Sequence, residues 1–428
     1  MKKFVVLLSL FAMTASVTSA RDYAKLQVKE MQHAQKYGST QRYFDTMSKE
    51  PSQQNINIPT MGKLKDPKIM DFEIPSKIDN TKYNAKLKAD NEIYKKIAKS
   101  FGVRTLDNYN AQAKGEDYYK LYRVAEKIIR ANNLDYQNWR IGVYRDADAP
   151  NAYSTNNLIC ISTSLFDTFR DNEDALAMVL GHEFGHALLG HQQRMAPIIS
   201  KLNTLAKAKA LGITFSPTAY SAMRRKYLID SKNMEYAADV EGAKLIAKAG
   251  FDTNKGMDVI AYLETLPHDK DYLSSHPNPN KRKDNLAQNK KLFIEEEWTE
   301  VGKYNIYNSE VLDVNQSSDR KSIVISGNSR RLNSDEYYRP ETPAQIYARC
   351  AYKSYVNGQL AKSIEYFNEL FKIDSSNAPA YLYASYASEA LYKNLGNKKY
   401  LENAKMYAKK AQELQPDNKY ILEQVDSL

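Results

Sequence analysis

The stretch Leu180-Gly181-His182-Glu183-Phe184-Gly185-His186 is the part of the sequence around which the fold is expected to be built. It lies in an apolar run from Ala175 to Leu189 that is long enough to form a helix. Because an α-helix turns by about 100° per residue, positions four apart differ by only ~40°. The two histidines therefore face the same way and can hold one metal ion. Glu183 lies beside them, free to take a proton from a metal-bound water.

The motif is specific for a chain with this composition. Histidine occurs only six times in 428 residues, and independent draws from the composition would produce His-Glu-x-x-His on the order of once in 200 such chains. The alternative is a helix that carries two histidines without a metal. It leaves unexplained why Glu183 stands inside an apolar helical run, because a buried carboxylate needs a partner.

A second segment, Ser231 to Asp239, offers the remaining ligand. Glu235 and Asp239 are four apart on a predicted helix, so both can face the same metal. A catalytic zinc site with two histidines needs a third protein ligand and one open position for water, and Glu235 can be that ligand. Asp239 can accept the ring N–H of a ligand histidine and fix its tautomer. Alone, this carboxylate spacing is usually a solvated helix face.

Two further positions lie downstream, and one nearby histidine is set aside. His276 precedes Pro277 in a predicted loop, and Arg282 follows six residues later. Near a catalytic zinc these side chains could serve an oxyanion, or His276 could occupy the open metal position. The alternative for a loop histidine is solvent exposure. His191 lies nine residues after His182, on roughly the opposite side of a continuous helix, and is not expected to be a ligand.

The segment before the motif alternates between helix and strand patterns. Apolar spacing predicts a helix from about Glu116 to Asn132 and a strand at Trp139–Tyr144. Strands at Asn151–Ser154 and Leu158–Ser162 flank a predicted turn at Asn156-Asn157. An edge strand near a catalytic metal can pair with an extended peptide substrate. We assign that role to this hairpin as a hypothesis, and an ordinary structural hairpin is the alternative. Further helices are expected at Pro197–Leu211 and Pro217–Leu228.

The N-terminus has the pattern of a secretory signal. Met1-Lys2-Lys3 is followed by an apolar run of about 14 residues and by Thr18-Ser19-Ala20. This pattern predicts a signal peptide over residues 1–20 that is removed after Ala20. Residues 21–80 are polar and punctuated by proline, which indicates an extended arm. No later segment is apolar enough to cross a bilayer. We therefore expect a periplasmic or secreted protein without a transmembrane segment after signal cleavage.

Composition limits the partners. The net charge is +10, with the lysines dispersed rather than gathered into a block, so no nucleic-acid partner is expected. A solvated basic surface is the simplest interpretation, and attraction to anionic lipid or nucleic acid is the alternative. The two cysteines, Cys160 and Cys350, do not form a disulfide framework. Cys160 is expected to be buried in a strand.

The C-terminal part reads as helical repeats. Residues 292–343 are polar and are expected to be a linker or small decoration, with a short strand near Ser322–Ser326. From Ala344 the pattern matches two tetratricopeptide-like units, with an insertion near Asn394–Lys399. The packing positions of their second helices are Ser363, Phe367 and Leu370, then Ala404, Ala408, Ala411 and Pro416. A plain bundle of helical hairpins is the alternative.

Together these motifs resemble the zinc metallopeptidase family that includes the CAAX prenyl protease and HtpX. The resemblance covers residues from about 90 to 290. It rests on His182-Glu183-x-x-His186, Glu235 with Asp239, Asn151-Ala152 ahead of the hairpin, and His276-Pro277 with Arg282. Within the family the chain is most similar to the soluble, exported, BepA-like members that carry C-terminal tetratricopeptide repeats.

The resemblance implies one Zn2+ per chain, held by His182, His186 and Glu235. It implies Glu183 as the general base and Asp239 as the residue that supports a ligand histidine. His276 matches a loop histidine that can block the fourth zinc position and keep such an enzyme latent. The sequence has Lys232 and Ala237 where the family often has Arg and Glu, which puts local salt bridges in doubt but not the metal site.

The predicted fold is mainly α. A gluzincin-type metalloprotease domain with a small β-hairpin or sheet spans residues 81–291, and a tetratricopeptide-like domain spans residues 344–428. The leading hypothesis is a zinc metalloendopeptidase that cleaves exported or envelope proteins, as in protein quality control. Its repeat domain would bind protein substrates or envelope and outer-membrane assembly proteins. The alternative is a chaperone or binding scaffold for outer-membrane precursors with latent or minor protease activity. A purely structural zinc is disfavoured, because two His and one Glu leave a position open.

Overall fold

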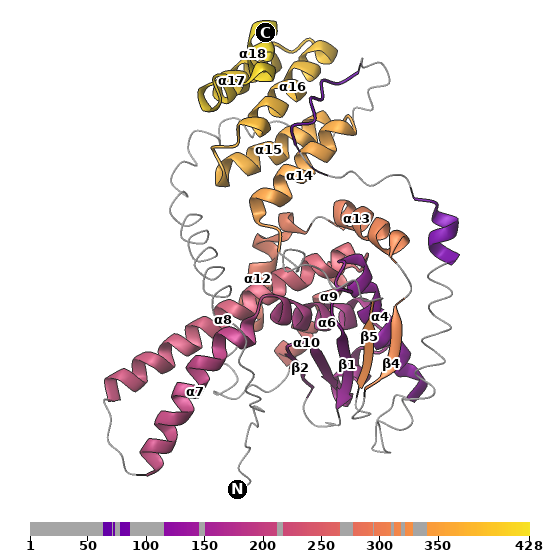
Figure 1. Ribbon diagram of the computed structural model, residues 1–428, viewed down its shortest axis with the longest axis vertical. Helices are drawn as coiled ribbons and strands as arrows, with labels where there is room; N and C mark the ends of the chain where they lie inside the picture. Colours follow the sequence, from indigo (N-terminus) through magenta and orange to yellow (C-terminus); the bar gives the residue numbers. More distant parts are fainter. Residues whose placement is uncertain are drawn as a thin grey trace. The chain divides into compact units, whose positions relative to one another are not determined.

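The structure is a computed structural model (Figure 1). It describes residues 63–70, 72, 78–85, 115–144, 150–211, 217–265, 277–293, 295–309, 312–317, 322–327 and 340–428, all of them in the unit formed by residues 56–428. This part of the chain is mostly helical with one small mixed sheet, as predicted. The predicted signal peptide, most of the polar arm and His276 lie outside the described residues.

The helix that the apolar spacing predicts from about Glu116 to Asn132 is present. A short 3-10 turn, η1 (Gly115–Tyr118), leads into α4 (Tyr119–Ala131). The apolar side chains that define the pattern are all buried, namely Tyr118, Leu121, Tyr122, Ala125, Ile128 and Ile129. Because they recur every three or four residues, they form one face, and α4 turns that face toward the core.

The sheet has five strands in the order β2-β3-β1-β5-β4. Their bounds are β1 (Trp139–Tyr144), β2 (Ala152–Thr155), β3 (Leu158–Ser162), β4 (Asp313–Gln316) and β5 (Ser322–Ser326). β1 and β3 are parallel, and the other pairs are antiparallel. The β2–β3 hairpin is confirmed, with Asn156 in the left-handed region of its turn. Cys160 is buried in β3, also as predicted, and it is a free thiol.

Residues 292–343 were expected to be a linker or a small decoration, and their described part is instead built into the fold. They contain α13 (Glu295–Asn308), β4 and β5. β5 pairs with β1, so this region supplies two of the five strands and forms the side of the sheet opposite β2. The strand expected at residues 322–326 is confirmed, whereas β4 was missed because its four residues, Asp-Val-Asn-Gln, show no apolar alternation. Trp298 of α13 is also buried in the core.

The central motif lies on α6 (Glu173–Leu188), which follows α5 (Thr163–Phe169). The Asn172 side chain caps α6 by accepting a hydrogen bond from the backbone N–H of Ala175, 3.0 Å away. α6 packs against β2 and β3. The rings of Phe184 and the buried Trp139 of β1 form a T-shaped contact, with 4.6 Å between centroids. The helix that carries the histidines is thus fixed on the sheet.

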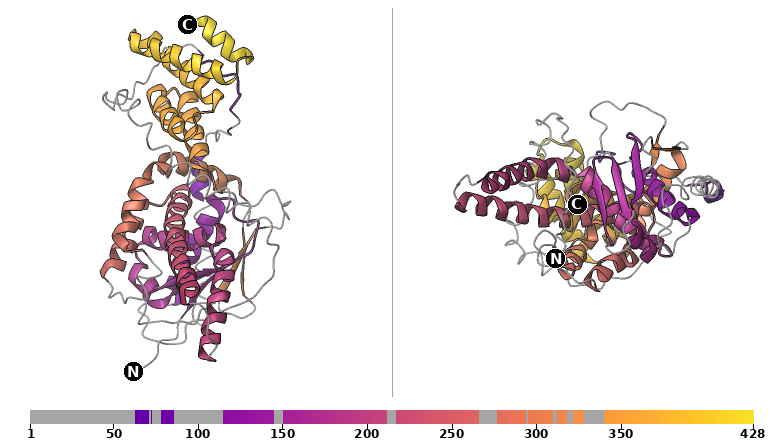
Figure 2. Two further views of the ribbon diagram at one scale, coloured as in Figure 1. Left: turned by 90° about the vertical axis from the view of Figure 1, so that its left-hand side faces the viewer. Right: turned by 90° about the horizontal axis from the view of Figure 1, so that it is seen from below.

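After α6 the chain forms two long helices that run side by side away from the sheet (Figure 1; Figure 2). They are α7 (His191–Ala210) and α8 (Pro217–Lys248). The sequence predicted separate helical pieces between residues 217 and 248, and the structure joins them into one helix of 32 residues. It ends at Lys248, and Gly250 follows in the turn with a φ of +78°, which suits a residue without a side chain.

Shorter helices complete the fold around α8. They are α9 (Thr253–Gly256), α10 (Asp258–Thr265), α12 (Pro279–Gln288) and the 3-10 turn η2 (Lys290–Leu292). Among the residues that the structure describes, none of the helices is both long and apolar enough to span a bilayer.

α6 and α8 cross with their backbones in contact. A Cβ atom on Gly242 of α8 would lie 2.7 Å from the backbone nitrogen of His182, and one on Gly181 would lie 2.9 Å from the carbonyl oxygen of Gly242. Farther along, a Cβ on Gly185 would lie 2.8 Å from the carbonyl oxygen of Ala238. Real Cβ atoms do not approach this closely, so glycine is what allows the two helices to meet.

Gly242→Ala is expected to destabilise the protein by about 1–3 kcal/mol, because overpacking forces backbone shifts. At an unhindered helix position the same substitution would stabilise the protein by ~1 kcal/mol, so a loss of stability would point to the close contact. Zinc affinity should fall with it, since α8 carries Glu235. Urea unfolding and zinc titration measure both effects. The control is Ala237→Ser, which adds one atom at an exposed position of the same helix. If Gly242→Ala is as stable as the parent, the close contact between α6 and α8 does not require glycine at this position.

The C-terminal helices form two hairpins and a final helix. α14 (Pro343–Val356) pairs with α15 (Leu360–Ile373), and α16 (Ala378–Leu395) pairs with α17 (Lys398–Leu414), followed by α18 (Lys419–Ser427). The insertion expected near residues 394–399 is not a separate loop. The extra residues lengthen α16 to 18 residues, against 14 in α14. Gly396, with φ of +67°, then ends α16 just before α17 begins.

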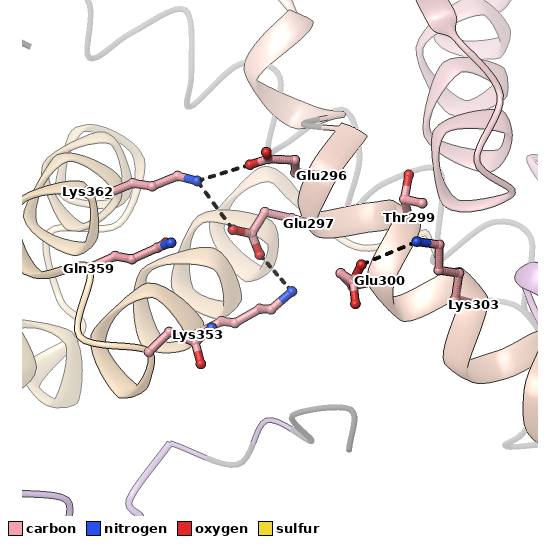
Figure 3. A pocket seen from close by; sticks show the side chains of 9 residues that line it. Glu296, Glu297, Thr299, Glu300, Lys303, Lys353, Gln359 and Lys362 are labelled. Carbon is pink, nitrogen blue, oxygen red and sulfur yellow. Dashed lines mark ion pairs between the residues drawn. The ribbon is translucent and has the colours of Figure 1, made fainter. Parts of the chain in front are cut away.

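A polar pocket lies between α13 and the α14–α15 hairpin (Figure 3). It is lined by Glu296, Glu297, Thr299, Glu300, Lys303, Lys353, Asn357, Gln359 and Lys362. The buried Glu297 lies 3.1 Å from the ammonium of Lys353 and 3.6 Å from that of Lys362. The lining has three carboxylates and three ammonium groups, and none of them belongs to the cluster described next. We interpret the pocket as a charged contact between α13 and the C-terminal helices.

Candidate metal centre

Three predicted ligands meet where α6 and α8 cross. His182 and His186 lie one turn apart on α6, and Glu235 lies on α8. Their ligand atoms all fall within 4.8 Å of one another. The two Nε2 atoms are 3.1 Å apart. The Glu235 carboxylate places Oε2 3.5 Å from Nε2 of His182 and Oε1 3.4 Å from Nε2 of His186.

These spacings fit a zinc ion. With bond lengths of about 2.0–2.1 Å and tetrahedral angles, two ligand atoms on one zinc lie ~3.3 Å apart. The three measured separations, 3.1, 3.4 and 3.5 Å, bracket that value. The donor set, two imidazoles and one carboxylate, is also the one found in catalytic zinc sites that keep a fourth position for water. The residues present therefore fit Zn2+.

Asp239 lies directly behind one ligand. Its Oδ1 is 2.8 Å from Nδ1 of His182, so this ring presents Nε2 to the cluster while its N–H points to the carboxylate. Arg282 of α12 donates to Asp239 from Nε at 2.8 Å and from Nη2 at 2.5 Å. Asp239 is fully buried, and Arg282 is nearly so. The pair thus holds His182 in one tautomer and one orientation.

Arg282 is placed differently from the expectation that it could serve an oxyanion. Its guanidinium is engaged with Asp239 and also lies 3.4 Å from Nδ1 of His182. This geometry favours a positioning role behind the ligand over contact with substrate. His276, the other downstream candidate, lies outside the described residues, so its gating of the zinc stays a prediction.

The carboxylates of Glu235 and Asp239 stabilise positive charge on the neighbouring imidazole. Burial lowers the pKa of His182, but its hydrogen bonds to Asp239 and Glu235 outweigh burial and raise the pKa to about 10. Burial raises the pKa of Glu235, and its hydrogen bonds to His182 and His186 reverse this and hold it well below the usual range. A divalent cation supplies the same kind of positive charge.

Glu183 follows His182 on α6 and is buried, with 7% of its surface exposed. It is not among the three clustered residues. The helix therefore places a carboxylate next to the metal ligands without using it as one. A carboxylate in that position can act as a base toward a water in the fourth metal position.

His191 was misjudged from the sequence. We expected it on the far side of the motif helix, but its Nδ1 lies 2.9 Å from Nδ1 of His186. The reason is local. α6 ends at Leu188, and Gly190, with φ of +64°, turns the chain so that His191 begins α7 behind the ligand.

His191 lies where it can orient the imidazole of His186. Because His186 presents Nε2 to the cluster, its Nδ1–H can donate to His191, as Asp239 accepts from His182. Burial, together with the nearby His186, lowers the pKa of His191 to about 2, so its ring is neutral. The spacing from His182 alone gave no signal, whereas the glycine at 190 could have shown that the helix ends there.

The hairpin lies next to the centre. β2 is one edge of the sheet, it contacts α6, and Tyr153 on it is 40% exposed. β3, in contrast, is paired on both sides, with β2 and with β1. Any strand that pairs with this edge of the sheet must therefore add to β2, beside the helix that carries the histidines.

Known proteins that resemble this chain are metallopeptidases, and the resemblance covers the residues of the metal centre. Residues 117–290 match the model of Peptidase family M48. Mitochondrial metalloendopeptidase OMA1 of Arabidopsis thaliana is 35% identical over 135 residues, which cover 30% of this chain and 27% of that protein. Metalloprotease YcaL of Escherichia coli (strain K12) is 26% identical over 211 residues, covering 44% of this chain and 78% of that protein. A third relative, mitochondrial metalloendopeptidase OMA1 of Saccharomyces cerevisiae, is 28% identical over 193 residues.

The match identifies the segment that holds the centre. The chain spans 27% of the Arabidopsis protein and 53% of the yeast protein, so it corresponds to parts of these relatives. The matched range, residues 117–290, includes His182, His186, Glu235, Asp239 and Arg282. This segment is therefore similar to Peptidase family M48 and to relatives that are named metalloendopeptidases or metalloproteases.

Proposed function

We propose that the protein is a zinc-dependent metalloendopeptidase of the gluzincin type. The observation that carries the proposal is the convergence of His182, His186 and Glu235, whose ligand atoms lie at the mutual spacing of a tetrahedral zinc site. Three protein ligands leave one position for water or substrate, which is the arrangement of catalytic rather than structural zinc.

Each residue of the centre then has a part in hydrolysis. Zinc, when bound, lowers the pKa of a water and polarises the scissile carbonyl. Glu183 takes the proton of the attacking water and passes it to the leaving amine. Asp239, held by Arg282, keeps the proton of His182 on Nδ1 so that Nε2 stays free as a ligand. The hydrogen bond between His186 and His191 orients the second imidazole in the same way.

We propose that the substrates are exported or envelope proteins, cleaved in the periplasm or after secretion. The support is the signal-like N-terminus and the family of the catalytic domain. The C-terminal helices α14–α18, with their paired hairpins, support a tetratricopeptide-like role in protein binding, including envelope assembly proteins. The second candidate, a chaperone or binding scaffold with minor cleavage, draws its support from the same helices.

Metal analysis paired with casein cleavage tests the central proposal. The purified chain is expected to contain one zinc per molecule and to hydrolyse casein. A strong chelator should abolish cleavage, and added zinc should restore it, because the ligands alone supply no nucleophile. Zinc at much less than one per chain, or cleavage that survives complete metal removal, would contradict the proposal.

The exposed edge of β2 provides a test of substrate docking. We expect an extended substrate to pair with β2, so a proline that removes an outward-facing N–H should reduce casein cleavage at least about tenfold. Successive residues of an edge strand alternate between facing the partner strand and facing outward, so Tyr153→Pro and Ser154→Pro form a matched pair.

Only the variant whose N–H faces outward should keep the fold and the zinc while losing cleavage. Circular dichroism and zinc content establish whether Tyr153→Pro or Ser154→Pro keeps the fold and the zinc. Proline within β3 is less informative, because β3 pairs on both sides and its loss would disrupt the sheet. If the folded variant cleaves casein at the parent rate, β2 is an ordinary structural strand.

A further inference from the structure

A short segment of the N-terminal arm lies on the C-terminal helices, far from the metal centre in sequence. Residues 63–70 form neither helix nor strand and contact side chains of α14, α16 and α18. The contacts join residues about 290–360 positions apart in the chain. We call the surface that receives this segment the tyrosine groove, after Tyr352, Tyr355, Tyr383 and Tyr386, which contact Lys65 or Asp66.

The groove holds the side chain of Lys65 at several points. The ammonium lies 2.9 Å from the Glu389 carboxylate, 2.7 Å from the side-chain oxygen of Gln424 and 3.3 Å from the Ser427 hydroxyl. It also lies 5.5 Å from the ring centroid of Tyr386, close enough for a cation–π contact. These groups come from two helices, α16 and α18, and contact one ammonium, whose side chain remains 43% exposed.

The receiving groups are built into the interior of the helical domain. Glu389 is 5% exposed and Gln424 is 1% exposed. Gln424 donates to Glu389 at 2.9 Å and to the buried Ser385 at 3.1 Å, which fixes its side-chain oxygen toward Lys65. Burial raises the pKa of Glu389, but hydrogen bonds from Lys393, Gln424 and Lys65 outweigh it and keep the carboxylate charged. A buried carboxylate is costly unless it is paired in this way.

The neighbouring Asp66 is bound by hydroxyl groups. Tyr383 donates to Oδ1 at 2.8 Å, and Tyr352 donates to Oδ2 at 3.1 Å. Tyr355 donates to the backbone carbonyl of Lys65 at 2.5 Å. The ammonium of Lys65 thus meets a carboxylate, and the carboxylate of Asp66 meets two hydroxyl groups. The backbone carbonyl between the two side chains also accepts a hydrogen bond.

Apolar contacts follow on the C-terminal side of this pair. Met70 is buried, Ile69 packs against the core, and the ring of Phe72 lies 6.2 Å from that of Tyr352. The segment thus presents a Lys-Asp pair followed by apolar side chains. A peptide from another protein with the same order of charged groups can make the side-chain contacts of Lys65 and Asp66, because the partner groups all belong to α14, α16 and α18.

We infer that the tyrosine groove is a peptide-binding site that residues 63–70 of the same chain cover. Its ligand class is an extended peptide of a partner protein that carries adjacent Lys and Asp residues followed by apolar residues. The covalently attached segment competes with any partner peptide as an intramolecular ligand. A partner peptide therefore binds the groove only by displacing the segment. This site is separate from the metal centre, and its occupancy does not depend on peptide hydrolysis.

Fluorescence anisotropy tests the groove with a fluorescein-labelled peptide that has the sequence of residues 63–72. The full chain carrying Lys65→Ala and Asp66→Ala together loses the charged contacts of its own segment and keeps only backbone and apolar ones, and we call it the vacated chain. We expect this vacated chain to bind the labelled peptide at least about tenfold more tightly than the unaltered chain does, because the internal competitor is weakened. A labelled peptide with Lys65→Gln and Asp66→Asn should bind the vacated chain at least tenfold more weakly.

Variants of the groove test recognition in the vacated chain. Tyr383→Phe removes only the hydroxyl that binds Asp66, and Glu389→Gln removes the charge that binds Lys65. Each should weaken peptide binding several-fold. Glu413→Gln is the matched control, because Glu413 lies on α17 with its side chain 52% exposed and paired with Lys410. It should bind the peptide as the vacated chain does.

The inference is overturned if the folded vacated chain does not bind the peptide, since residues 63–70 are then only a structural strap. It is also overturned if the unaltered chain binds as tightly as the vacated one, since the segment then does not cover the groove. Should the vacated chain fail to fold, hydrogen exchange of residues 63–70 in the unaltered chain replaces it. Millimolar unlabelled peptide is expected to speed that exchange, and an unchanged rate rejects the proposal.

Discussion

Glu183→Gln is expected to reduce casein hydrolysis by about 10²–10⁴-fold, the usual contribution of a general base. The substitution replaces a proton acceptor with an amide of nearly the same shape, so the packing of α6 should not change. Glu183 is not one of the three clustered ligands, and zinc content should remain at one per chain. Steady-state cleavage and metal analysis of the same preparation measure the two quantities side by side.

The matched control lies on the same helix. Glu173→Gln makes the same chemical change in the first turn of α6, where the side chain is 40% exposed and lies 3.5 Å from Arg123. Its cleavage rate should equal that of the parent. A Glu183→Gln enzyme that keeps more than about a tenth of the parent rate would assign proton transfer to another group, because the expected loss is at least about a hundredfold.

Asp239→Ala is expected to cost about 3–5 kcal/mol of stability, since it removes the carboxylate from a buried ion pair and leaves the Arg282 charge in the interior. It also removes the acceptor of the His182 ring N–H, and such partners typically contribute 10–100-fold to metal affinity. Urea unfolding of the zinc-free chain measures the first effect. Competition with a metal-binding dye measures the second.

Two comparisons separate charge from shape at this position. Asp239→Asn keeps an oxygen that can accept from His182 but loses the charge that faces Arg282, so it should lie between the parent and Asp239→Ala in both measurements. Asp171→Ala is the surface control, with a side chain 78% exposed beside Lys120, and it should change neither quantity. If Asp239→Ala matches that control, Asp239 does not support the centre.

The metal centre could be predicted from the sequence because its geometry is mostly local. His182 and His186 share one helix face by their spacing, and the same holds for Glu235 and Asp239. The structure adds what spacing cannot supply, namely the contact that brings the two helices together. Gly181 and Gly242 enable that contact, but nothing in the sequence near either glycine indicates which partner it meets.

Other features depend on contacts that no local pattern encodes. β5 follows β1 by almost 180 residues and pairs with it, so its region looked like a linker when read alone. His191 was misplaced because one residue, Gly190, ends the helix that the pattern continued. Lys65 and Asp66 lie in a polar arm with little periodicity, and their contacts appear only when the C-terminal helices are folded.

The pairing of β1 with β5 has a consequence for how the protein is made. A shortened chain that ends at residue 290 contains all seven polar residues assigned to the centre but lacks β5. In it, β1 would become an exposed edge of apolar residues, the kind of edge that recruits other chains and aggregates. During synthesis the same gap persists until residue 326 has emerged. The metal-binding residues are therefore translated long before the sheet that supports them can close.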